Sequence, residues 1–363
     1  MHAARQSIAL TKTHMTRWHE RLGPVALGAA VALLAHDAAF AQGDTCKNRG
    51  QLDTLYCDED GDLVADVPKD AKKWRDPATL VFAYTPVEDP ALYQNIFKPF
   101  TDYLAQCTGR RVVYYPVQSN AAEVEAMRAG RLHVASFSTG PTGFAVNLAG
   151  AVPFAARGDE KGPGGYNLVS VVRADSPYQK LADLKDRRVA HTAPSSNSGH
   201  LAPLVLYPQE GLRPYEDYKP LMSGGHDKSV LGVRSGDYDM AGVASTVFER
   251  MALRGTVRGE DFRIIYRSPL FPTASFAYAN DLKPDLAGKI TACFFAFRFP
   301  PEMVKEFQGD DRFQPIDYRR DWAVVREVAE KSGTPYNKAA YDAEARREAD
   351  ALAKRQQSAS PKQ

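Results

Sequence analysis

The stretch Val189–Pro203 constrains the fold of this chain most, because it joins a strand to a helix through a turn of small polar residues. Val189–Thr192 has the composition of a strand end, and Pro194 stops regular structure behind it. The serines and the asparagine that follow are typical N-cap residues, and the first N–H groups of a helix have no partner within it. Because the macrodipole places positive charge at that end, the turn predicts an oxyanion site, with an ordinary capped turn as the alternative.

Similar strand-to-helix steps recur along the chain. We predict strands at 79–84, 111–117, 132–137, 166–173, 189–192, 262–266 and 275–279, a connector at 268–273, and helices from there to about 331. Alternation of strands and helices with short loops predicts an α/β fold with mostly parallel sheets, in which ligands bind at the carboxyl ends of the strands. Residues at these strand ends are therefore candidate ligand contacts: Tyr84, Asn120, Ser138 and Thr139.

Residues 1–41 have the pattern of a secretory signal peptide. Arg17 and Arg21 precede an apolar run at 25–34, and Ala39–Ala41 is a small-x-small cleavage motif. We expect cleavage between Ala41 and Gln42. The apolar run is too short to span a bilayer, and a hydrophobic helix of the fold is the alternative.

Export leads to an oxidising compartment, where four cysteines can form disulfides. Cys46 and Cys57 flank a short polar loop and could pair, which would leave Cys107 and Cys293 as a second pair. Four cysteines allow three connectivities, and the sequence does not choose among them. Buried free thiols are the alternative for Cys107 and Cys293.

A polar N-terminal extension at 42–78 contains an acidic loop. Its carboxylates alternate as ligands do in the first half of a calcium loop, at Asp58, Asp60, Asp62 and Asp66. However, glycine stands at the fourth position rather than the sixth, and Lys69 takes the place of the closing glutamate. A solvated acidic turn is therefore the simpler interpretation, with a calcium site as the alternative.

Composition excludes several classes of function. The 46 basic residues nearly balance the 44 acidic ones, so the charge gives no argument for nucleic-acid binding. The length of 363 residues suggests about two domains beyond the signal peptide. The chain has no Gly-x-Ser-x-Gly elbow, His-Glu-x-x-His motif, P-loop or Rossmann fingerprint. We therefore expect a protein that is not an enzyme and uses no cofactor or metal.

Several motifs together resemble a known family. They are Asp175-Ser-Pro with Leu181-Ala-Asp-Leu-Lys, the turn at 194–199, Gly225-His, Gly236-Asp-Tyr-Asp and Tyr266-Arg-Ser-Pro. From about residue 79 to 322 the chain resembles the periplasmic substrate-binding proteins of phosphate, phosphite and phosphonate importers of the ABC class. The resemblance implies two α/β lobes joined by two crossing strands, with the ligand trapped between them by hinge closure. It places one lobe at 79–170 and 271–340 and the other at 171–266. The Ala-, Glu-, Arg- and Lys-rich composition of 341–363 separately predicts a charged helical or disordered tail.

The resemblance also implies the site. By position, Ser196, Asn197 and Ser198 hold the ligand's oxygens, His226 binds a phosphonyl oxygen, and Tyr166 lines the cleft at a crossing strand. Asn120 stands where the family has a tyrosine. Binders of aminoalkylphosphonates place acidic residues at two positions that are Thr246 and Ala274 here.

These assignments predict a ligand and a partner. We expect a small oxyanion without an amine (phosphite, phosphate or a simple alkylphosphonate), captured in the periplasm by a monomer and passed to an ABC permease in the inner membrane. The alternative is a sensor that reports an oxyanion such as arsenite to a membrane histidine kinase. Arsenite would favour a cleft thiol, for which Cys107 is the candidate.

Overall fold

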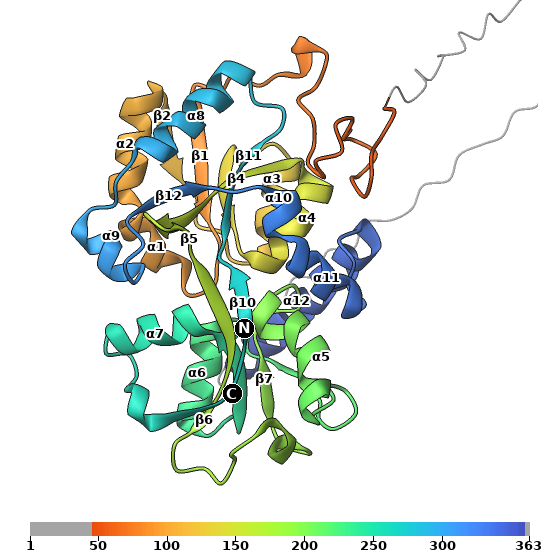
Figure 1. Cartoon of the computed structure of the whole chain (residues 1–363), viewed down its shortest axis with the longest axis vertical. Helices are drawn as coiled ribbons and strands as arrows, with labels where there is room; N and C mark the ends of the chain where they lie inside the picture. The colour runs from red at the N-terminus through yellow and green to blue at the C-terminus, as the bar shows by residue number, and fades with distance from the viewer. Residues whose placement is uncertain (1–45, 360–363) are drawn as a thin grey trace, which may run out of the picture. The chain divides into compact units, whose positions relative to one another are not determined.

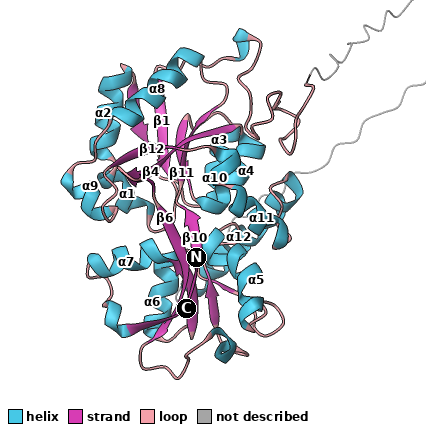
Figure 2. Cartoon of the chain, in the orientation of Figure 1, coloured by secondary structure: helices cyan, strands magenta, loops and turns pink. Residues whose placement is uncertain are grey.

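The computed structural model describes residues 46–359, which form two β-sheets with helices packed on them (Figure 1; Figure 2). The predicted signal peptide at 1–41 lies outside the described residues. Among the described helices, none combines the length and the apolar character needed to cross a bilayer.

The first sheet has seven strands, in the order β12-β4-β11-β3-β1-β2 with β5 paired to β4. Its parallel part is β1 with β2 and β3, whereas β11, β4, β12 and β5 pair antiparallel. We call this sheet and the helices on it the first lobe. Its strands are β1 Thr79–Tyr84, β2 Arg111–Tyr114, β3 Val134–Phe137, β4 Ala151–Asp159, β5 Gly162–Pro163, β11 Ser275–Ala279 and β12 Arg312–Pro315.

The second sheet has five strands, in the order β10-β6-β9-β7-β8, and with its helices it forms the second lobe. β7 is parallel to β8 and β9, and β6 is antiparallel to β9 and β10. Both sheets are therefore mixed rather than mostly parallel. The strands are β6 Gly165–Arg173, β7 Val189–His191, β8 Leu221–Met222, β9 Met240–Ala244 and β10 Phe262–Pro272.

Helices follow the carboxyl ends of the parallel strands, as the alternation predicts. In the first part of the chain they are α1 Pro90–Ile96, α2 Lys98–Thr108, α3 Asn120–Arg128 and α4 Thr139–Ala149, with the short η1 Ala71–Lys73 before them. In the second lobe they are η2 Leu181–Leu184, the π-helix η3 Asn197–Leu201, α5 Ala202–Leu206, η4 Tyr207–Glu210, α6 His226–Ser235, α7 Ser245–Leu253 and η5 Gly259–Asp261. The remainder are α8 Pro284–Ala296, α9 Pro301–Glu306, α10 Tyr318–Asp321, α11 Ala323–Lys331 and α12 Lys338–Ala359.

The chain passes between the two lobes twice, and the two passages lie side by side. β5 ends at Pro163 just before β6 begins, and β10 ends just before β11. β6 and β10 pair antiparallel, with Phe271 opposite Tyr166 and Pro272 opposite Gly165. Figure 1 shows both strands running from one sheet toward the other. The chain therefore has the two crossing strands that the resemblance implied, while the residue limits given for the lobes stay a prediction.

Several strands differ from the sequence prediction: β4, β5, β8, β9 and β12 were not predicted, and β10 is longer than predicted. Proline explains the differences at β4 and β10. The interval of β4 contains Pro153, and β10 continues through Pro269, where a connector was predicted. Proline is tolerated at bulges and on edge strands; β10 lies at the edge of its sheet and has a register shift there. The four residues of β12 interrupt a segment predicted to be helical, since a strand this short has little pattern of its own.

The first lobe is filled by aromatic side chains. The Phe100 ring lies 4.7 Å from that of Phe294 and 5.0 Å from that of Phe313, and the Phe276 ring lies 4.8 Å from that of Phe313. All four side chains are fully or almost fully buried. Burial of each such side chain stabilises the fold by about 1.5–3 kcal/mol, so this cluster fixes α2 and α8 on the sheet.

Two disulfides form, Cys46–Cys57 and Cys107–Cys293. This is the pairing that local spacing suggested, and the described residues include no free cysteine. The second disulfide joins α2 to α8 across 186 residues of sequence, both within the first lobe.

The double variant Cys107→Ser, Cys293→Ser should lower the free energy of unfolding by about 2–4 kcal/mol, because the disulfide closes a long loop in the unfolded chain. Urea unfolding monitored by circular dichroism measures the change. The matched control is the double variant Cys46→Ser, Cys57→Ser, which opens a loop of only 11 residues and should lose less free energy of unfolding. Equal losses in the two variants would contradict the expectation.

Candidate functional site

A small cavity of about 50 Å³ lies where strand ends of the two lobes meet. Its volume admits a ligand the size of a few water molecules. The described residues that line it include no carboxylate. They are Tyr84, Thr85, Val87, Ser138, Thr139, Arg157, Tyr166, Ser196, Asn197, Ser198, His226, Ala244, Thr246, Val247, Arg250, Thr273 and Ala274.

Four helices begin at this cavity: α4 in the first lobe, and η3, α6 and α7 in the second. The residues before α4, α6 and α7 are Ser138, Gly225 and Ala244, and none of them caps its helix with a side-chain hydrogen bond. The first backbone N–H groups of a helix point outward and carry the positive end of its dipole. The cavity is therefore surrounded by donors and partial positive charge suited to an anion.

The turn that the sequence singled out forms one wall. Ser196 is the N-cap of η3, and its Oγ accepts from the N–H of Gly199 at 3.1 Å. Asn197 Nδ2 donates to the hydroxyl of Tyr166 at 3.1 Å, and Asn197 Oδ1 has no hydrogen-bond partner among residues 46–359. Ser196, Asn197 and Ser198 are all buried. They lie together in the cavity wall, with Tyr166 from the crossing strand behind them.

His226 presents one defined nitrogen to the cavity. Its Nδ1 accepts from the backbone N–H of Ala244 at 3.1 Å, so the proton of the neutral ring is on Nε2. Nε2 lies 3.5 Å from Ser196 Oγ. Burial lowers the pKa of His226 to about 4; nearby Glu88 raises it by a smaller amount, and Arg250 lowers it further. At neutral pH the ring is therefore an uncharged donor.

The first lobe contributes strand ends and the start of α4. Ser138 and Thr139 line the cavity, and Thr139 Oγ1 donates to the carbonyl of Pro272 at 2.9 Å. Tyr84 also lines it, while its ring packs against Tyr93 with the centroids 4.4 Å apart. Packing and cavity lining thus coexist at Tyr84.

Asn120 is the one predicted site residue that does not line this cavity. It is the first residue of α3, and Ser119 is the N-cap. Asn120 Nδ2 donates to Ser195 Oγ at 3.2 Å, and its Oδ1 accepts from Ser138 Oγ at 3.4 Å. Because Ser195 belongs to the second lobe, Asn120 joins the lobes beside the cavity instead of facing into it.

Two arginines, which the sequence did not single out, also line the cavity. Arg157 comes from β4, which the sequence did not reveal as a strand. Its Nη1 donates to Asp310 at 2.7 Å, and its buried Nε has no partner among the described residues. Arg250 comes from α7, and its guanidinium donates to Glu88 at 2.7 Å. Each cation is thus balanced by a carboxylate that lies outside the lining.

Arg250 belongs to a buried ion-pair network between the lobes. Arg250 of α7 and Arg254, the residue after that helix, both pair with Glu88, which lies beyond β1 of the first lobe. Arg254 also pairs with Glu306 of α9. Burial alone would raise the pKa of Glu88, but the two guanidinium groups and the Tyr93 hydroxyl lower it below its usual value. Glu88 therefore stays ionised and holds α7 against the first lobe.

Thr85 and Thr273 add two hydroxyls that the sequence did not single out. Both line the cavity and are buried, and within the described part of the chain neither Oγ1 has a hydrogen-bond partner. Buried hydroxyls are normally paired, so these two are suited to contact a bound ligand. Each of these two threonines directly follows a strand, and this position is the sequence signal that could have identified it as a lining residue.

The thiol considered for arsenite has a different role. Cys107 is bonded to Cys293 and is not among the lining residues. The sensor alternative therefore has no support here.

Comparison with known proteins identifies the family. The model for periplasmic substrate-binding proteins of ABC phosphonate transporters matches residues 82–322, more than half of the chain, so the chain belongs to this family. It is a periplasmic substrate-binding component of ABC phosphonate or phosphate transport. The phosphate-import protein PhnD of Mycolicibacterium smegmatis is 27% identical over 266 residues, covering 69% of this chain and 81% of that protein. The phosphonates-binding periplasmic protein of Escherichia coli is 24% identical over 208 residues, covering 56% and 62%.

Solved structures share the fold. A binding protein component of an ABC phosphonate transporter from Pseudomonas aeruginosa has a TM-score of 0.64 and 22% identity, with 77% of this chain and 100% of that chain covered. PhnD1 from Prochlorococcus marinus, in complex with methylphosphonate, has a TM-score of 0.64 and 19% identity, with 71% and 99% covered. These likenesses establish a fold of two α/β lobes.

The lobes touch closely at Gly140, the second residue of α4. A Cβ atom at Gly140 would lie 2.2 Å from the Ser195 carbonyl oxygen and 3.0 Å from the Asn197 nitrogen. Both are backbone atoms of the second lobe, so they cannot move aside as a flexible side chain can. Only glycine allows α4 to approach the turn this closely.

The variant Gly140→Ala should force the lobes apart. Inserting a methyl group into a close-packed contact costs about 1–3 kcal/mol. We expect the free energy of unfolding to fall by that amount and the radius of gyration, measured by small-angle X-ray scattering, to increase. Gly288→Ala is the matched control, because Gly288 lies within α8 with no atom near its Cβ position. Wild-type values for both quantities in Gly140→Ala would contradict the proposed contact.

Proposed function

We propose that the cavity binds a small phosphorus oxyanion without an amine, namely phosphite, phosphate or a simple alkylphosphonate. The protein would deliver this ligand to the ABC permease of its importer in the inner membrane. The residues proposed to contact the oxygens are Ser196, Asn197, Ser198, His226, Ser138 and Thr139, with Tyr166 and Tyr84 completing the wall.

The observation that carries the proposal is the convergence of four helix N-termini on a cavity whose described lining has no carboxylate. An anion that leaves water needs several strong donors, or its burial is costly. Backbone N–H groups, serine and threonine hydroxyls and the Nε2–H of His226 provide such donors around one small volume. The described lining residues thus favour acceptor-rich ligands.

The charge balance supports exclusion of amines. Arg157 and Arg250 face the cavity but are paired with Asp310 and Glu88, and these carboxylates are outside the lining. A ligand ammonium group would meet two guanidinium groups and no carboxylate partner. The ammonium group of an aminoalkylphosphonate would therefore lack the charge-assisted hydrogen bonds that a carboxylate provides, and these are the strong ones.

The relatives support the same class of ligand. The Mycolicibacterium protein is named for phosphate import, and the Prochlorococcus structure is described in complex with methylphosphonate. Both ligands present several oxygens on one tetrahedral phosphorus. The small volume of the cavity is in keeping with groups of this size.

Isothermal titration calorimetry with phosphite, phosphate, methylphosphonate, 2-aminoethylphosphonate and arsenite tests the proposal. We expect at least one of the first three to bind most tightly, and Ser196→Ala to weaken that ligand by about 1–3 kcal/mol, since one ligand oxygen or its neighbouring donor loses a partner. Ser176→Ala, a partly exposed serine of the same lobe, is the control and should bind as wild type. Tightest binding of 2-aminoethylphosphonate, or full affinity in Ser196→Ala, would refute the assigned site.

Thr246→Asp tests why amines are excluded. A carboxylate about 4 Å from a bound anion opposes it by about 4 kcal/mol at an effective dielectric constant near 20. We therefore expect weaker binding of the preferred oxyanion and a shift of the affinity ratio toward 2-aminoethylphosphonate, measured by the same titrations. Thr246→Asn introduces a side chain with the shape of aspartate but without its charge, and it should leave the affinity ratio unchanged. An unchanged ratio in Thr246→Asp would argue that residue 246 does not face the ligand.

A further inference from the structure

The acidic loop of the N-terminal extension is folded against the first lobe, and none of its residues lines the cavity. The carbonyl of Asp66 accepts from Asn280 Nδ2 at 2.8 Å, and the carbonyl of Gly61 accepts from Arg319 at 3.2 Å. Val64 and Ala65 within the loop are buried. Asp60 and Asp62 are exposed, as a solvated acidic turn predicts, whereas Asp58 is buried and its carboxylate needs another explanation.

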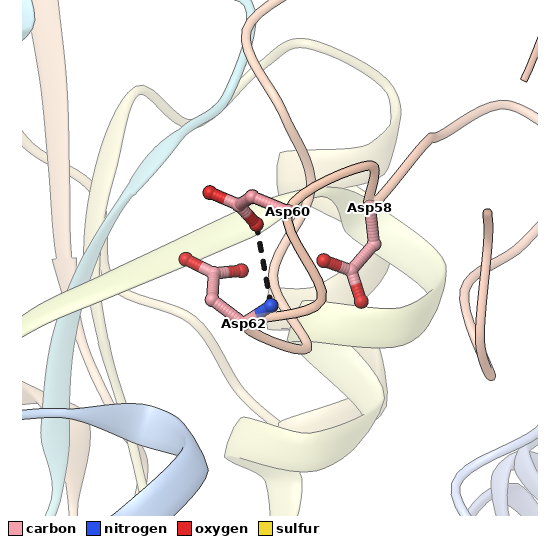
Figure 3. A group of neighbouring side chains, drawn as sticks. All are labelled: Asp58, Asp60 and Asp62. Atoms are coloured by element: carbon pink, nitrogen blue, oxygen red, sulfur yellow. Dashed lines mark hydrogen bonds between the residues drawn. The ribbon is translucent and has the colours of Figure 1, made fainter. Parts of the chain in front are cut away.

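Three of these carboxylates lie close together. Asp58, Asp60 and Asp62 each offer one oxygen, and the three oxygens are within 4.8 Å of one another (Figure 3). Oxygen ligands lie 2.3–2.6 Å from a calcium ion, so two ligands on opposite sides of the ion are about 5 Å apart. The spacing of the three carboxylates therefore fits one calcium ion between them.

Asp58 supplies a second and separate observation, because it is buried without a counterion. The residue is 1% exposed, its Oδ2 accepts from the N–H of Leu63 at 3.2 Å, and its Oδ1 has no hydrogen-bond partner in the described part of the chain. Figure 3 shows its carboxylate turned toward the other two. No ion pair formed by residues 46–359 includes any of the three aspartates, although Glu59 in the same loop pairs with Lys69. A buried carboxylate in this setting is costly unless a cation neutralises it.

The backbone of the loop turns at its sixth position, although the sequence has its glycine at the fourth. Counting from Asp58, the sixth position is Leu63, which adopts the left-handed conformation with φ of 72°. Calcium loops have their sharp turn at this position, where glycine is usual. Asp60 Oδ1 accepts from the N–H of Asp62 at 3.2 Å, and Asp62 Oδ1 accepts from the N–H of Val64 at 2.8 Å. The chain thus turns as a calcium loop does, without the glycine that a sequence motif requires.

We propose that Asp58, Asp60 and Asp62 bind a calcium ion that holds the N-terminal extension on the first lobe. The twelfth position is Lys69, which pairs with Glu59, so the bidentate closing carboxylate of a calcium loop is missing. Fewer protein ligands mean weaker binding, and we expect a dissociation constant in the range of extracellular modules, about 10⁻⁴–10⁻³ M. The site is independent of the oxyanion cavity.

Calcium titration of the purified protein tests the site directly. After treatment with a chelator and its removal, isothermal titration calorimetry with CaCl₂ should show one site, and 10 mM CaCl₂ should raise the midpoint of thermal unfolding by about 2–4 °C. Asp60→Asn should lose at least about tenfold in calcium affinity, because it removes a ligand charge. Its amide oxygen can still accept from Asp62 N–H, so the loop keeps its turn.

Glu59→Gln is the matched control, since it removes one charge from the same loop but no ligand atom, and it should bind calcium as wild type does. Asp58→Asn provides a further variant: if it folds, it should also lose calcium binding. Absence of a binding isotherm and of a thermal shift in the wild-type protein would overturn the proposal. So would an equal response of Asp60→Asn and Glu59→Gln, or MgCl₂ that binds as tightly as CaCl₂.

Discussion

The structure depends on one arrangement: the carboxyl ends of parallel strands from both lobes face the same small volume. β1 and β3 of the first lobe and β9 of the second end at the cavity, and α4 and α7 begin there. The backbone thereby supplies hydrogen-bond donors and partial positive charge to the cavity. Helix dipoles provide this charge without the cost of burying a cationic side chain. The antiparallel strands have other roles: β6 and β10 carry the chain between the lobes, whereas β4, β11 and β12 complete the first sheet. Ion pairs such as Arg250 with Glu88 keep the wall close to neutral while they join the lobes.

Features governed by neighbours in the sequence could be predicted. The span of β1 is the predicted one, and the turn at 194–199 forms the cavity wall, because strand ends, prolines and N-cap residues act over a few residues. The short spacing of Cys46 and Cys57 suggested their disulfide, and the second pair followed only if the first was assumed. The family resemblance added what local patterns do not contain, namely two lobes with two crossing strands.

Features that depend on distant contacts could not. Arg157 reaches the cavity only because β4 lies between β11 and β12, and a proline within β4 hides that strand from any alternation rule. Asn120 follows a strand as the lining residues do, yet its side chain bonds to Ser195 across the lobes. The acidic loop is a further case, because the burial of Asp58 and the backbone conformation of Leu63 come from packing on the first lobe. Pattern alone places such residues on a loop and says nothing of their surroundings.

The hydrogen bond from Asn197 to Tyr166 has a mechanical consequence. Tyr166 stands on β6 directly opposite Phe271 of β10, where the two connections between lobes run side by side. The wall of the cavity and the joint between the lobes are thus one bonded unit. In the proposed complex, an oxyanion bound to the amide of Asn197 would therefore be one hydrogen bond away from a strand that carries the chain between the lobes.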